Sequence, residues 1–432
     1  MENNLERLIG DKSEDELAFV ACAALPFLPK PEVLRCAPFN EHLSRIYYAA
    51  RIVEQVSEVY KHHIRKIITP VVGRCRGKEV PWGYFEGKFF RPFIGAVTYR
   101  MLSGYSHFDI KTTLDPDMNE AENLRGFKPT LALIEEGETE ISRYSKKTGS
   151  FVDSGIISSF VAVEKAHMYT LILDEIQDGA KQRRGHPTLN AVFGNEIAEL
   201  IGGIVAKRAT NLSLRSKYPL VQKILSECLV RTAWGQIQEF TIRDTLRDLR
   251  GEGNESRIKE TLRSIYEQQI CSSGEKTGPL IGASTRIAAL YNAATEETVG
   301  ALCSYTESLG LAVQITDDAL DVYGNRKRMG KDVRKDMRLN LANRVVGEAL
   351  RSKNLKKTEK RIIVQALTGD GMDDELYERA YDIVAQRGRE GIDVALIEQL
   401  RLVSKGADSI PAPVEDIKFL KFIGDLISIR AA

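Results

Sequence analysis

Two clusters of acidic side chains lie within otherwise apolar stretches of this 432-residue sequence. The first occupies residues 174–178 (DEIQD) and the second residues 317–321 (DDALD), and each has an aspartate at both ends. Residues four apart share one face of a helix, with their Cβ atoms about 5–6 Å apart. Each cluster therefore predicts a pair of carboxylates on one helical face. Two such pairs facing each other could hold several divalent cations.

Basic residues follow both clusters and indicate the ligand that these cations would share. Carboxylate oxygens suit Mg2+, which keeps part of its water shell and commonly binds one or two protein carboxylates together with substrate phosphate oxygens. Lys and Arg side chains neutralise phosphate directly, so the pattern predicts a diphosphate ester as substrate. The basic residues are Lys181, Arg183 and Arg184 after the first cluster, and Arg326, Lys327, Arg328 and Lys331 after the second.

Either cluster alone would be a weak indication, because charged residues at these spacings usually form a solvated, salt-bridged helical face. The surroundings favour a functional site instead. Residues 160–163 and 168–173 before the first cluster, and residues 309–315 before the second, are apolar on nearly all sides, which is typical of a buried helix. A carboxylate at the end of a buried helix needs a cation or an equivalent partner, since an uncompensated buried charge is very costly.

Five segments spread along the chain combine basic, acidic and amide side chains. They are residues 87–92 (GKFFRP), residues 174–187 (DEIQDGAKQRRGHP), the pair Gly235 and Gln236, the pair Lys276 and Thr277, and residues 314–331 (QITDDALDVYGNRKRMGK). In this order they resemble the motifs of a known family, the trans-isoprenyl diphosphate synthases, also called polyprenyl synthetases. The resemblance covers about residues 80–340 directly, and agreement between several spaced motifs is far more specific than any one of them.

The resemblance implies a role for each matching residue. Four aspartates would hold several Mg2+ ions between them, namely Asp174 and Asp178 on one side and Asp317 and Asp321 on the other. A second set would bind the allylic diphosphate, namely Arg183, Gln236, Lys276 and Lys331. Thr277, Gln314 and Asp318 are expected to bind substrate as well. A third set matches positions that bind the diphosphate of isopentenyl diphosphate, namely Lys88, Arg91, His167 and Arg184. The residues expected to act in catalysis are Asp174, Asp178, Asp317, Lys276 and Lys331.

The resemblance also implies an all-α, isoprenoid synthase-type helical bundle around a central cavity, and a homodimer. The implied activity is a Mg2+-dependent prenyl transfer, in which isopentenyl diphosphate condenses head to tail with an allylic diphosphate and diphosphate is released. Two alternatives stay open. A class I terpene cyclase of the same fold ionises a single diphosphate and would not need the third set of residues. A non-catalytic partner subunit of another prenyl synthase would have eroded aspartates.

Chain length should depend on the side chains that close the cavity below the first acidic cluster. The fifth residue before Asp174 is Tyr169 and the fourth is Thr170. A side chain one helical turn further from the diphosphate site meets the growing tail about 5.4 Å deeper, so Tyr169 should act as a stop. In the family, a single aromatic at the fifth position resembles the geranylgeranyl type, and aromatics at both positions suggest the farnesyl type. Tyr169 could equally be an ordinary core aromatic.

Four positions depart from the family pattern. Glu175 replaces a usual second Asp, Val313 a usual Phe, and Asn195 a frequent Asp. Asn340 stands where a Lys is common, which removes one positive charge from the expected diphosphate site. Metal binding should survive these changes, because Asp174 and Asp178 remain.

Composition and local sequence argue against a nucleic-acid-binding, disulfide-bonded, membrane-spanning or secreted protein. The net charge of +1 gives no electrostatic reason to expect binding to nucleic acid or to an anionic membrane. The six cysteines lack CxxC spacing, which favours free thiols in a reducing compartment. We expect no membrane span, because no apolar run reaches the roughly 18 residues required. The acidic residues 14–16 argue against a secretory or transit leader, so a cytoplasmic protein is expected.

Helical periodicity dominates the chain. Prolines at 29, 31 and 38 predict a boundary between an N-terminal helical extension, residues 1–40, and a catalytic domain, residues 41–432. Apolar residues at 189, 192, 193, 197, 200, 201 and 204 follow the three-and-four spacing of one core-facing helix. The connection between residues 104 and 154 is longer than in the family, and it has no functional account.

Overall fold

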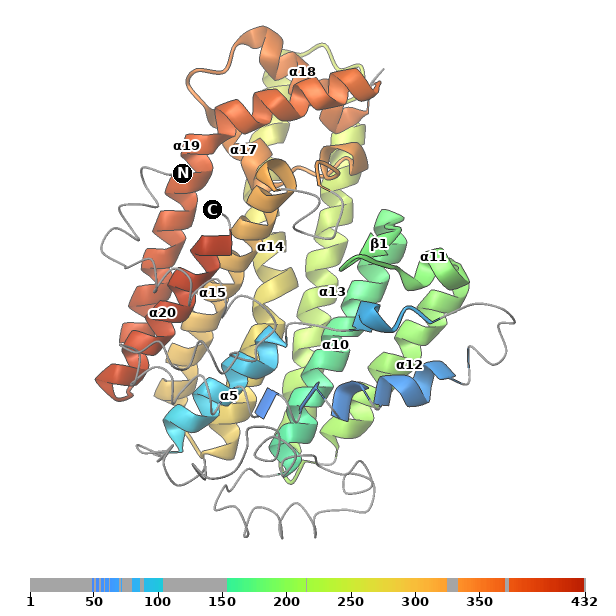
Figure 1. Cartoon of the computed structure of the whole chain (residues 1–432). Helices are drawn as coiled ribbons and strands as arrows, with labels where there is room; N and C mark the ends of the chain where they lie inside the picture. The colour runs from blue at the N-terminus through green and yellow to red at the C-terminus, as the bar shows by residue number, and fades with distance from the viewer. Residues whose placement is uncertain are drawn as a thin grey trace, which may run out of the picture.

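The computed structural model describes residues 80–85, 89–103, 154–214, 216–324, 333–369 and 373–430, with scattered positions between 49 and 71. The predicted extension at residues 1–40 and the long connection after residue 103 lie outside this described part. Figure 1 shows an elongated bundle of helices, which confirms the predicted all-α class. The only strands among the described residues are two of two residues each, β1 (Gln182–Arg183) and β2 (His186–Pro187), paired antiparallel.

Long helices run side by side through the bundle (Figure 1). Helix α13 packs against α14, α14 against α15, and α15 against α19, while α10 packs on α12 and α14. The helices are α5 (Phe90–Leu102), α10 (Ser154–Asp178), α11 (Leu189–Phe193), α12 (Asn195–Ser213), α13 (Leu220–Arg247), α14 (Glu255–Tyr291), α15 (Glu296–Tyr323), α17 (Arg344–Arg351), α18 (Lys357–Thr368), α19 (Asp374–Asp408) and α20 (Val414–Arg430). Two 3-10 turns, η1 (Trp82–Phe85) and η2 (Met337–Leu339), lie in the connections.

Side-chain caps begin two of the long helices that carry site residues, α14 and α15. Asn254 caps α14 by accepting hydrogen bonds from the backbone N–H groups of Ser256 and Arg257, at 3.0 and 3.2 Å. Thr295 caps α15 by accepting from Thr298 at 3.2 Å. Such caps satisfy backbone donors that have no partner within the helix. The chain therefore specifies locally where each of these long helices starts.

Helices α14 and α15 come very close where two glycines meet. A Cβ atom placed on Gly310 would lie 2.5 Å from the Cα atom of Gly278. Only glycine permits this approach of two backbones. The contact lies next to Thr277 and one turn before Gln314, so it sets the spacing between the helix that carries Lys276 and the helix that carries the second acidic cluster.

Helix α10 is the central apolar helix of the bundle. Its span Gly155–Asp178 is long and apolar enough to cross a membrane, by length and composition alone, whereas we expected no such span from the sequence. In the structure, 67% of its most apolar window is buried inside the molecule. It packs on α12, α14, α13 and α5. This burial by protein neighbours explains why the helix is apolar on nearly all sides.

The expected single core-facing helix over residues 189–204 is wrong. Gly194 interrupts it with φ 88°, and the segment forms α11 and α12 instead. Ile201 is 1% exposed and faces the core, but Leu200 and Ile204 are 69% and 43% exposed. The spacing therefore described two apolar faces, of which one is buried and one lies at the surface.

Candidate active site

The first acidic cluster occupies the last turn of α10. The helix ends at Gly179, whose φ of 61° is the left-handed conformation common at helix C-termini, and the N–H of Ala180 bonds the carbonyl of Glu175 at 3.0 Å. The C-terminal end of a helix carries partial negative charge. Asp174 and Asp178 add to this charge, so the site needs cations.

Two cations from different elements face Asp174. The ammonium of Lys276 on α14 lies 3.4 Å from Asp174 Oδ1, and the guanidinium of Arg183 on β1 lies 4.0 Å from Oδ2. Burial alone raises the pKa of Asp174, but the charges of Lys276 and Arg183 outweigh burial and hold that pKa below its usual value. Asp174 is therefore ionised and available to a metal ion.

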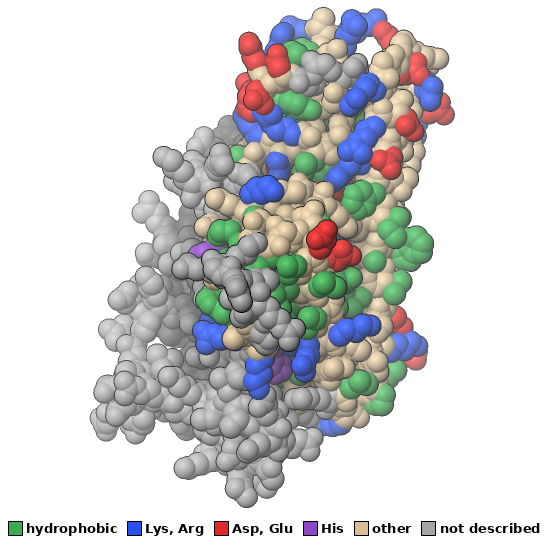
Figure 2. Space-filling model, turned by 90° about the vertical axis from the view of Figure 1, so that its right-hand side faces the viewer, with side chains coloured by type: hydrophobic (Ala, Val, Ile, Leu, Met, Phe, Trp, Pro, Cys, Tyr) green, Lys and Arg blue, Asp and Glu red, His purple; other side chains and the backbone are tan. Residues whose placement is uncertain are grey.

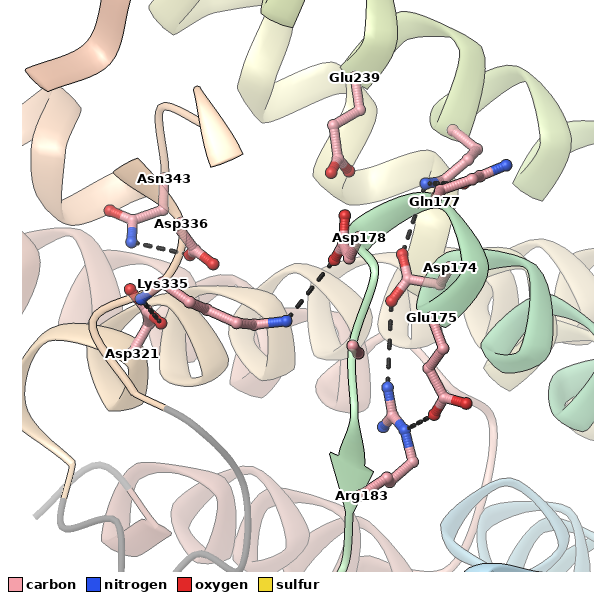
Figure 3. A network of polar contacts seen from close by, with 12 residues as sticks. Asp174, Glu175, Gln177, Asp178, Arg183, Glu239, Asp321, Lys335, Asp336 and Asn343 are labelled. Carbon is pink, nitrogen blue, oxygen red and sulfur yellow. Dashed lines mark hydrogen bonds and ion pairs between the residues drawn. The ribbon is translucent and has the colours of Figure 1, made fainter. Parts of the chain in front are cut away.

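Asp178 lies between two further cations. Arg243 on α13 donates to Oδ1 at 3.2 Å, and the ammonium of Lys335 lies 3.5 Å from Oδ2. Figure 3 shows Lys335 reaching across from the second acidic cluster toward Asp178. Burial and the neighbouring charge of Asp174 raise the pKa of Asp178 to about 6.

One face of α13 carries polar residues that contact the first acidic cluster and Lys276. Gln236 donates to Gln177 at 2.8 Å and to Asp174 at 3.4 Å, and Glu239 binds the ammonium of Lys276. A Cβ on Gly235 would lie 2.9 Å from the backbone nitrogen of Lys276. Glycine at this position therefore lets α13 approach α14 closely enough for these side chains to meet.

Glu175, the departure from the family pattern in the first cluster, shares Arg183 with Asp174 but is more deeply buried. It is 2% exposed, accepts a 2.6 Å hydrogen bond from the hydroxyl of Tyr84, and forms an ion pair with Arg183. The backbone carbonyl of Tyr84 also accepts from Arg184 at 3.1 Å. Glu175 and Tyr84 thus hold the short β1–β2 hairpin that carries both arginines against α10 and η1.

The second acidic cluster lies on the last turns of α15. Asp318 is buried and accepts three hydrogen bonds, from Gln269 at 3.1 Å, Gln314 at 2.9 Å and the backbone N–H of Arg344 at 2.7 Å. Burial raises the pKa of Asp318 to about 7. Thr277 donates to the other end of Gln314 at 3.0 Å. These contacts join α14, α15 and α17 structurally, and the substrate-binding role expected for Asp318, Gln314 and Thr277 stays a prediction.

Asp321 connects α15 to the segment that follows it. Its Oδ1 accepts from the backbone N–H of Lys335 at 3.2 Å, and its backbone carbonyl accepts from Arg334 at 2.8 Å. A few residues on, Asn343 donates to Asp336 at 3.0 Å. The segment that begins at residue 333 is therefore attached to the end of α15 and lies beside the first cluster (Figure 3).

A second group of cations lies near Asp317. Burial lowers the pKa of Arg91 on α5, while the charges of Glu164 and Asp317 act in the opposite direction. The buried Nε of Arg91 has no hydrogen-bond partner among the described residues. A buried guanidinium N–H needs an acceptor.

His167 lies on α10 among these cations. Burial, together with the charges of Arg91 and Arg184, holds the pKa of His167 well below its usual value. The imidazole is therefore neutral and can donate a hydrogen bond without adding charge. Arg91, Arg184 and His167 therefore lie close enough to influence one another electrostatically, and the substrate-binding role expected for them stays a prediction.

Two predicted site residues, Lys88 and Lys331, lie outside the described residues, as do Arg326, Lys327 and Arg328. Of the chain-length residues, the half-buried Tyr169 lies against α12, because a Cβ on Gly202 would be 3.4 Å from Tyr169 Cδ2. The hydroxyl of Thr170 donates to the carbonyl of His167 at 2.8 Å.

The chemistry of the donor set fits a divalent cation. The carboxylates of Asp174, Asp178, Asp317 and Asp321 offer only oxygen ligands, as Mg2+ requires. Among the described residues, no three acidic, histidine or cysteine side chains are gathered closely enough to hold an ion by themselves. A Mg2+ ion held here would take one or two carboxylates and complete its shell with water and phosphate oxygens.

Sequence reasoning missed several residues of the site. Glu239 and Arg243 lie three and seven positions after Gln236 on one helical face, so that spacing could have revealed them. Tyr84 and Lys335 come from short connections, and no local pattern marks them.

The fold and the paired aspartates define an isoprenoid synthase-type helical bundle. The chain superposes on the crystal structure of a decaprenyl diphosphate synthase from Rhodobacter capsulatus with a TM-score of 0.62 and 20% sequence identity, over 90% of this chain and 99% of that one. This similarity supports the shared fold.

Sequence comparison identifies the family. The profile of the polyprenyl synthetase family matches residues 150–384, and the chain belongs to this family. It is 32% identical over 233 residues to a short chain isoprenyl diphosphate synthase of Methanocaldococcus jannaschii, over 53% of this chain and 65% of that relative. It is 28% identical over 316 residues to a probable mitochondrial hexaprenyl pyrophosphate synthase of Yarrowia lipolytica, over 67% of this chain and 66% of the relative.

Proposed function

We propose that this protein condenses isopentenyl diphosphate with an allylic diphosphate and releases diphosphate. One observation carries the proposal. The site has two groups of cationic side chains, one around Asp174 with Lys276 and Arg183, and one formed by Arg91 with Arg184. Two groups suit two diphosphates, whereas a cyclase binds one.

The residues around α10 would act on the allylic substrate. Lys276 and Arg183 neutralise its diphosphate, and Mg2+ bound by the four aspartates would supply the remaining positive charge as the C–O bond breaks and the diphosphate leaves with the bonding electrons. The double bond of isopentenyl diphosphate then forms the new C–C bond to the allylic carbon. A proton leaves the resulting cation and is taken up by the departing diphosphate.

The second group would orient isopentenyl diphosphate for this attack. Arg91 offers a buried N–H group without a described partner, and Arg184 is held by the Tyr84 carbonyl. Neutral His167 can donate to a phosphate oxygen without repelling the allylic cation. Orientation of the two substrates accounts for much of the rate enhancement expected of such a site.

The product we propose is a twenty-carbon, geranylgeranyl chain, with a farnesyl chain as the runner-up. Tyr169 supports this length, because it lies five residues before Asp174 on α10 and packs against Gly202 of α12. A half-buried aromatic at this depth would stop the growing tail. The names of the similar proteins range from short chain to hexaprenyl and decaprenyl. Sequence similarity therefore does not indicate the product length, and the proposed length rests on Tyr169.

The partner we propose is a second copy of the chain. Helix α13 exposes Val230, Trp234 and Ile237 by 56%, 60% and 50% of their surfaces, and α12 exposes Leu200 and Ile204. On the face that carries α11 and α12, hydrophobic side chains gather near mid-height (Figure 2). An apolar patch of this kind usually marks an interface. Because twofold symmetry brings the same patch of two copies together, one patch is enough for a homodimer.

Product analysis separates the proposed activity from its alternatives. Purified protein is incubated with Mg2+ and isopentenyl diphosphate plus dimethylallyl, geranyl or farnesyl diphosphate, and the dephosphorylated products are identified by mass. We expect a longer linear alcohol that requires isopentenyl diphosphate. A hydrocarbon or terpene alcohol from one allylic diphosphate alone would indicate a cyclase. The absence of product with every primer would indicate a partner subunit.

A further inference from the structure

Lys335 links the two acidic clusters directly. Its backbone N–H donates to Asp321 Oδ1 at 3.2 Å, and its ammonium lies 3.5 Å from Asp178 Oδ2. Figure 3 shows the side chain extended between the end of α15 and the end of α10. One residue therefore places a positive charge between carboxylates that come from motifs far apart in the sequence.

The backbone around Lys335 is fixed on both sides. Arg334 has φ 56°, in the left-handed region that non-glycine residues seldom adopt. Its N–H bonds the carbonyl of Asp321, and its guanidinium pairs with Glu378 at 2.8 Å and Asp382 at 3.0 Å on α19. The carbonyl of Lys335 accepts from Leu339 at 3.1 Å. The direction of the Lys335 side chain is therefore set by the fold.

Lys335 is the more exposed of the two cations at Asp178. Arg243 and Asp178 are 8% and 7% exposed at their side chains, whereas Lys335 is 36% exposed. The lysine ammonium sits on a flexible four-carbon stem and bonds as a point charge. It can move to a new anion while its backbone stays in place.

Asn340 occupies the position at which a lysine is common in the family. Compared with the family pattern, this chain therefore lacks one positive charge at that position. Asn340 is nearly buried, donates to the carbonyl of Leu367 at 2.8 Å and accepts from Arg247 at 3.3 Å. It therefore anchors the connection to α18 and α13, whereas Lys335, five residues earlier, is a cation of the same segment that reaches Asp178.

We propose that Lys335 is a diphosphate-binding residue which, in the substrate-free protein, takes the place of a bound cation between the two acidic clusters. This inference rests on the proposed function. A divalent ion at Asp178 repels the ammonium, so metal binding displaces Lys335 from the carboxylate. Phosphate oxygens that arrive with the metal then accept its hydrogen bonds. The clusters are thereby kept neutralised both before and after the substrate binds.

The test measures two affinities that change in opposite directions. Lys335→Gln removes the charge, Lys335→Arg keeps it, and Lys353→Gln removes an equal charge from an exposed position outside the site. The affinity for Mn2+ is measured without diphosphate, by following free Mn2+ with electron paramagnetic resonance. The affinity for inorganic diphosphate is measured by isothermal titration calorimetry in excess Mg2+. Circular dichroism confirms that each variant is folded.

We expect Lys335→Gln to bind Mn2+ about threefold more tightly or better, since its competitor is gone, and diphosphate about tenfold more weakly, the size of one lost charge-assisted hydrogen bond. Lys335→Arg and Lys353→Gln should match the unmodified protein within about threefold. Unchanged Mn2+ affinity, or undiminished diphosphate affinity, in Lys335→Gln would overturn the inference and leave Lys335 as a structural tether. Failure of the unmodified protein to bind Mn2+ or diphosphate would instead overturn the proposed function, and this inference with it.

Discussion

The hydroxyl of Tyr84 donates a 2.6 Å hydrogen bond to Oε2 of Glu175, and the other oxygen of that carboxylate binds Arg183. Glu175 is 2% exposed. Burial raises its pKa, and these two partners act against that rise. The glutamate that departs from the family pattern therefore holds Arg183, an arginine of the proposed diphosphate site, and Tyr84 holds the glutamate.

Replacing Tyr84 with Phe should weaken substrate binding more than it weakens the fold. Without the hydroxyl, Glu175 loses a buried partner, which costs about 1–3 kcal/mol, and Arg183 is held less firmly. We expect the KM for the allylic diphosphate to rise about fivefold or more, with a smaller change in kcat. Tyr291→Phe is the matched control, because it removes a hydroxyl that contacts Ser216 at 2.8 Å elsewhere. Equal kinetics for the two variants would contradict the positioning role.

The sequence predicted the acidic pairs because their geometry is local. Asp174 and Asp178 lie on one turn of α10, and helical spacing requires that they share a face. The cations beside them were harder to place. Lys335 reaches Asp178 from a connection in which Arg334 adopts a left-handed conformation, and helical periodicity does not predict such a conformation.

The wrong prediction for residues 189–204 has a physical reason as well. Apolar spacing reports which side chains avoid water, and it does not say whether a core or another subunit covers them. Ile201 and Leu200 satisfy the same periodicity, yet one is buried and the other is 69% exposed. The break at Gly194, with φ 88°, depends on a conformation that glycine permits but does not require.

Changes at the two chain-length positions should shift the product in opposite directions. Tyr169→Ala removes the side chain that packs against Gly202 and should let the tail grow beyond its usual length, one helical turn or about 5.4 Å deeper. Thr170→Phe adds an aromatic closer to Asp174 and should shorten the product toward the farnesyl length. Mass analysis of dephosphorylated products checks both. Identical products from both variants and the unmodified protein would show that neither residue lines the floor of the cavity.

Stabilisation by metal should depend on pH through Asp178. Burial and the charge of Asp174 raise its pKa to about 6, whereas an unfolded aspartate titrates near 3.9. In the metal-free protein, Asp178 contributes stability that is complete below about pH 4 and is lost as the pH rises through about 6.

A divalent ion binds the ionised carboxylate and stabilises the folded state. We therefore expect Mg2+ to raise the Tm more at about pH 7.5 than at about pH 5. Thermal scans with and without Mg2+ at both pH values measure this, and Asp178→Asn should reduce the difference. A larger effect of Mg2+ at the lower pH would contradict the assignment of Asp178 as a ligand.

The exposed apolar patch predicts a self-associating protein. Trp234 is 60% exposed on α13, and placing a charge there should disrupt an apolar interface between two copies. Sedimentation should show a dimer for the unmodified protein and a shift toward monomer for Trp234→Glu. Leu402→Glu on α19 is the control, because Leu402 is also 51% exposed but lies on another helix. A monomer in the unmodified protein would refute the homodimer.

The central claim is that aspartates of both clusters promote prenyl transfer together. The most direct measurement is the rate of incorporation of labelled isopentenyl diphosphate into a longer prenyl diphosphate, compared for the unmodified protein, Asp174→Asn and Asp317→Asn, with circular dichroism on each. We predict product from the unmodified protein and a rate at least about a hundredfold lower in either variant, with the helical spectrum unchanged. Full turnover in either variant would contradict the claim.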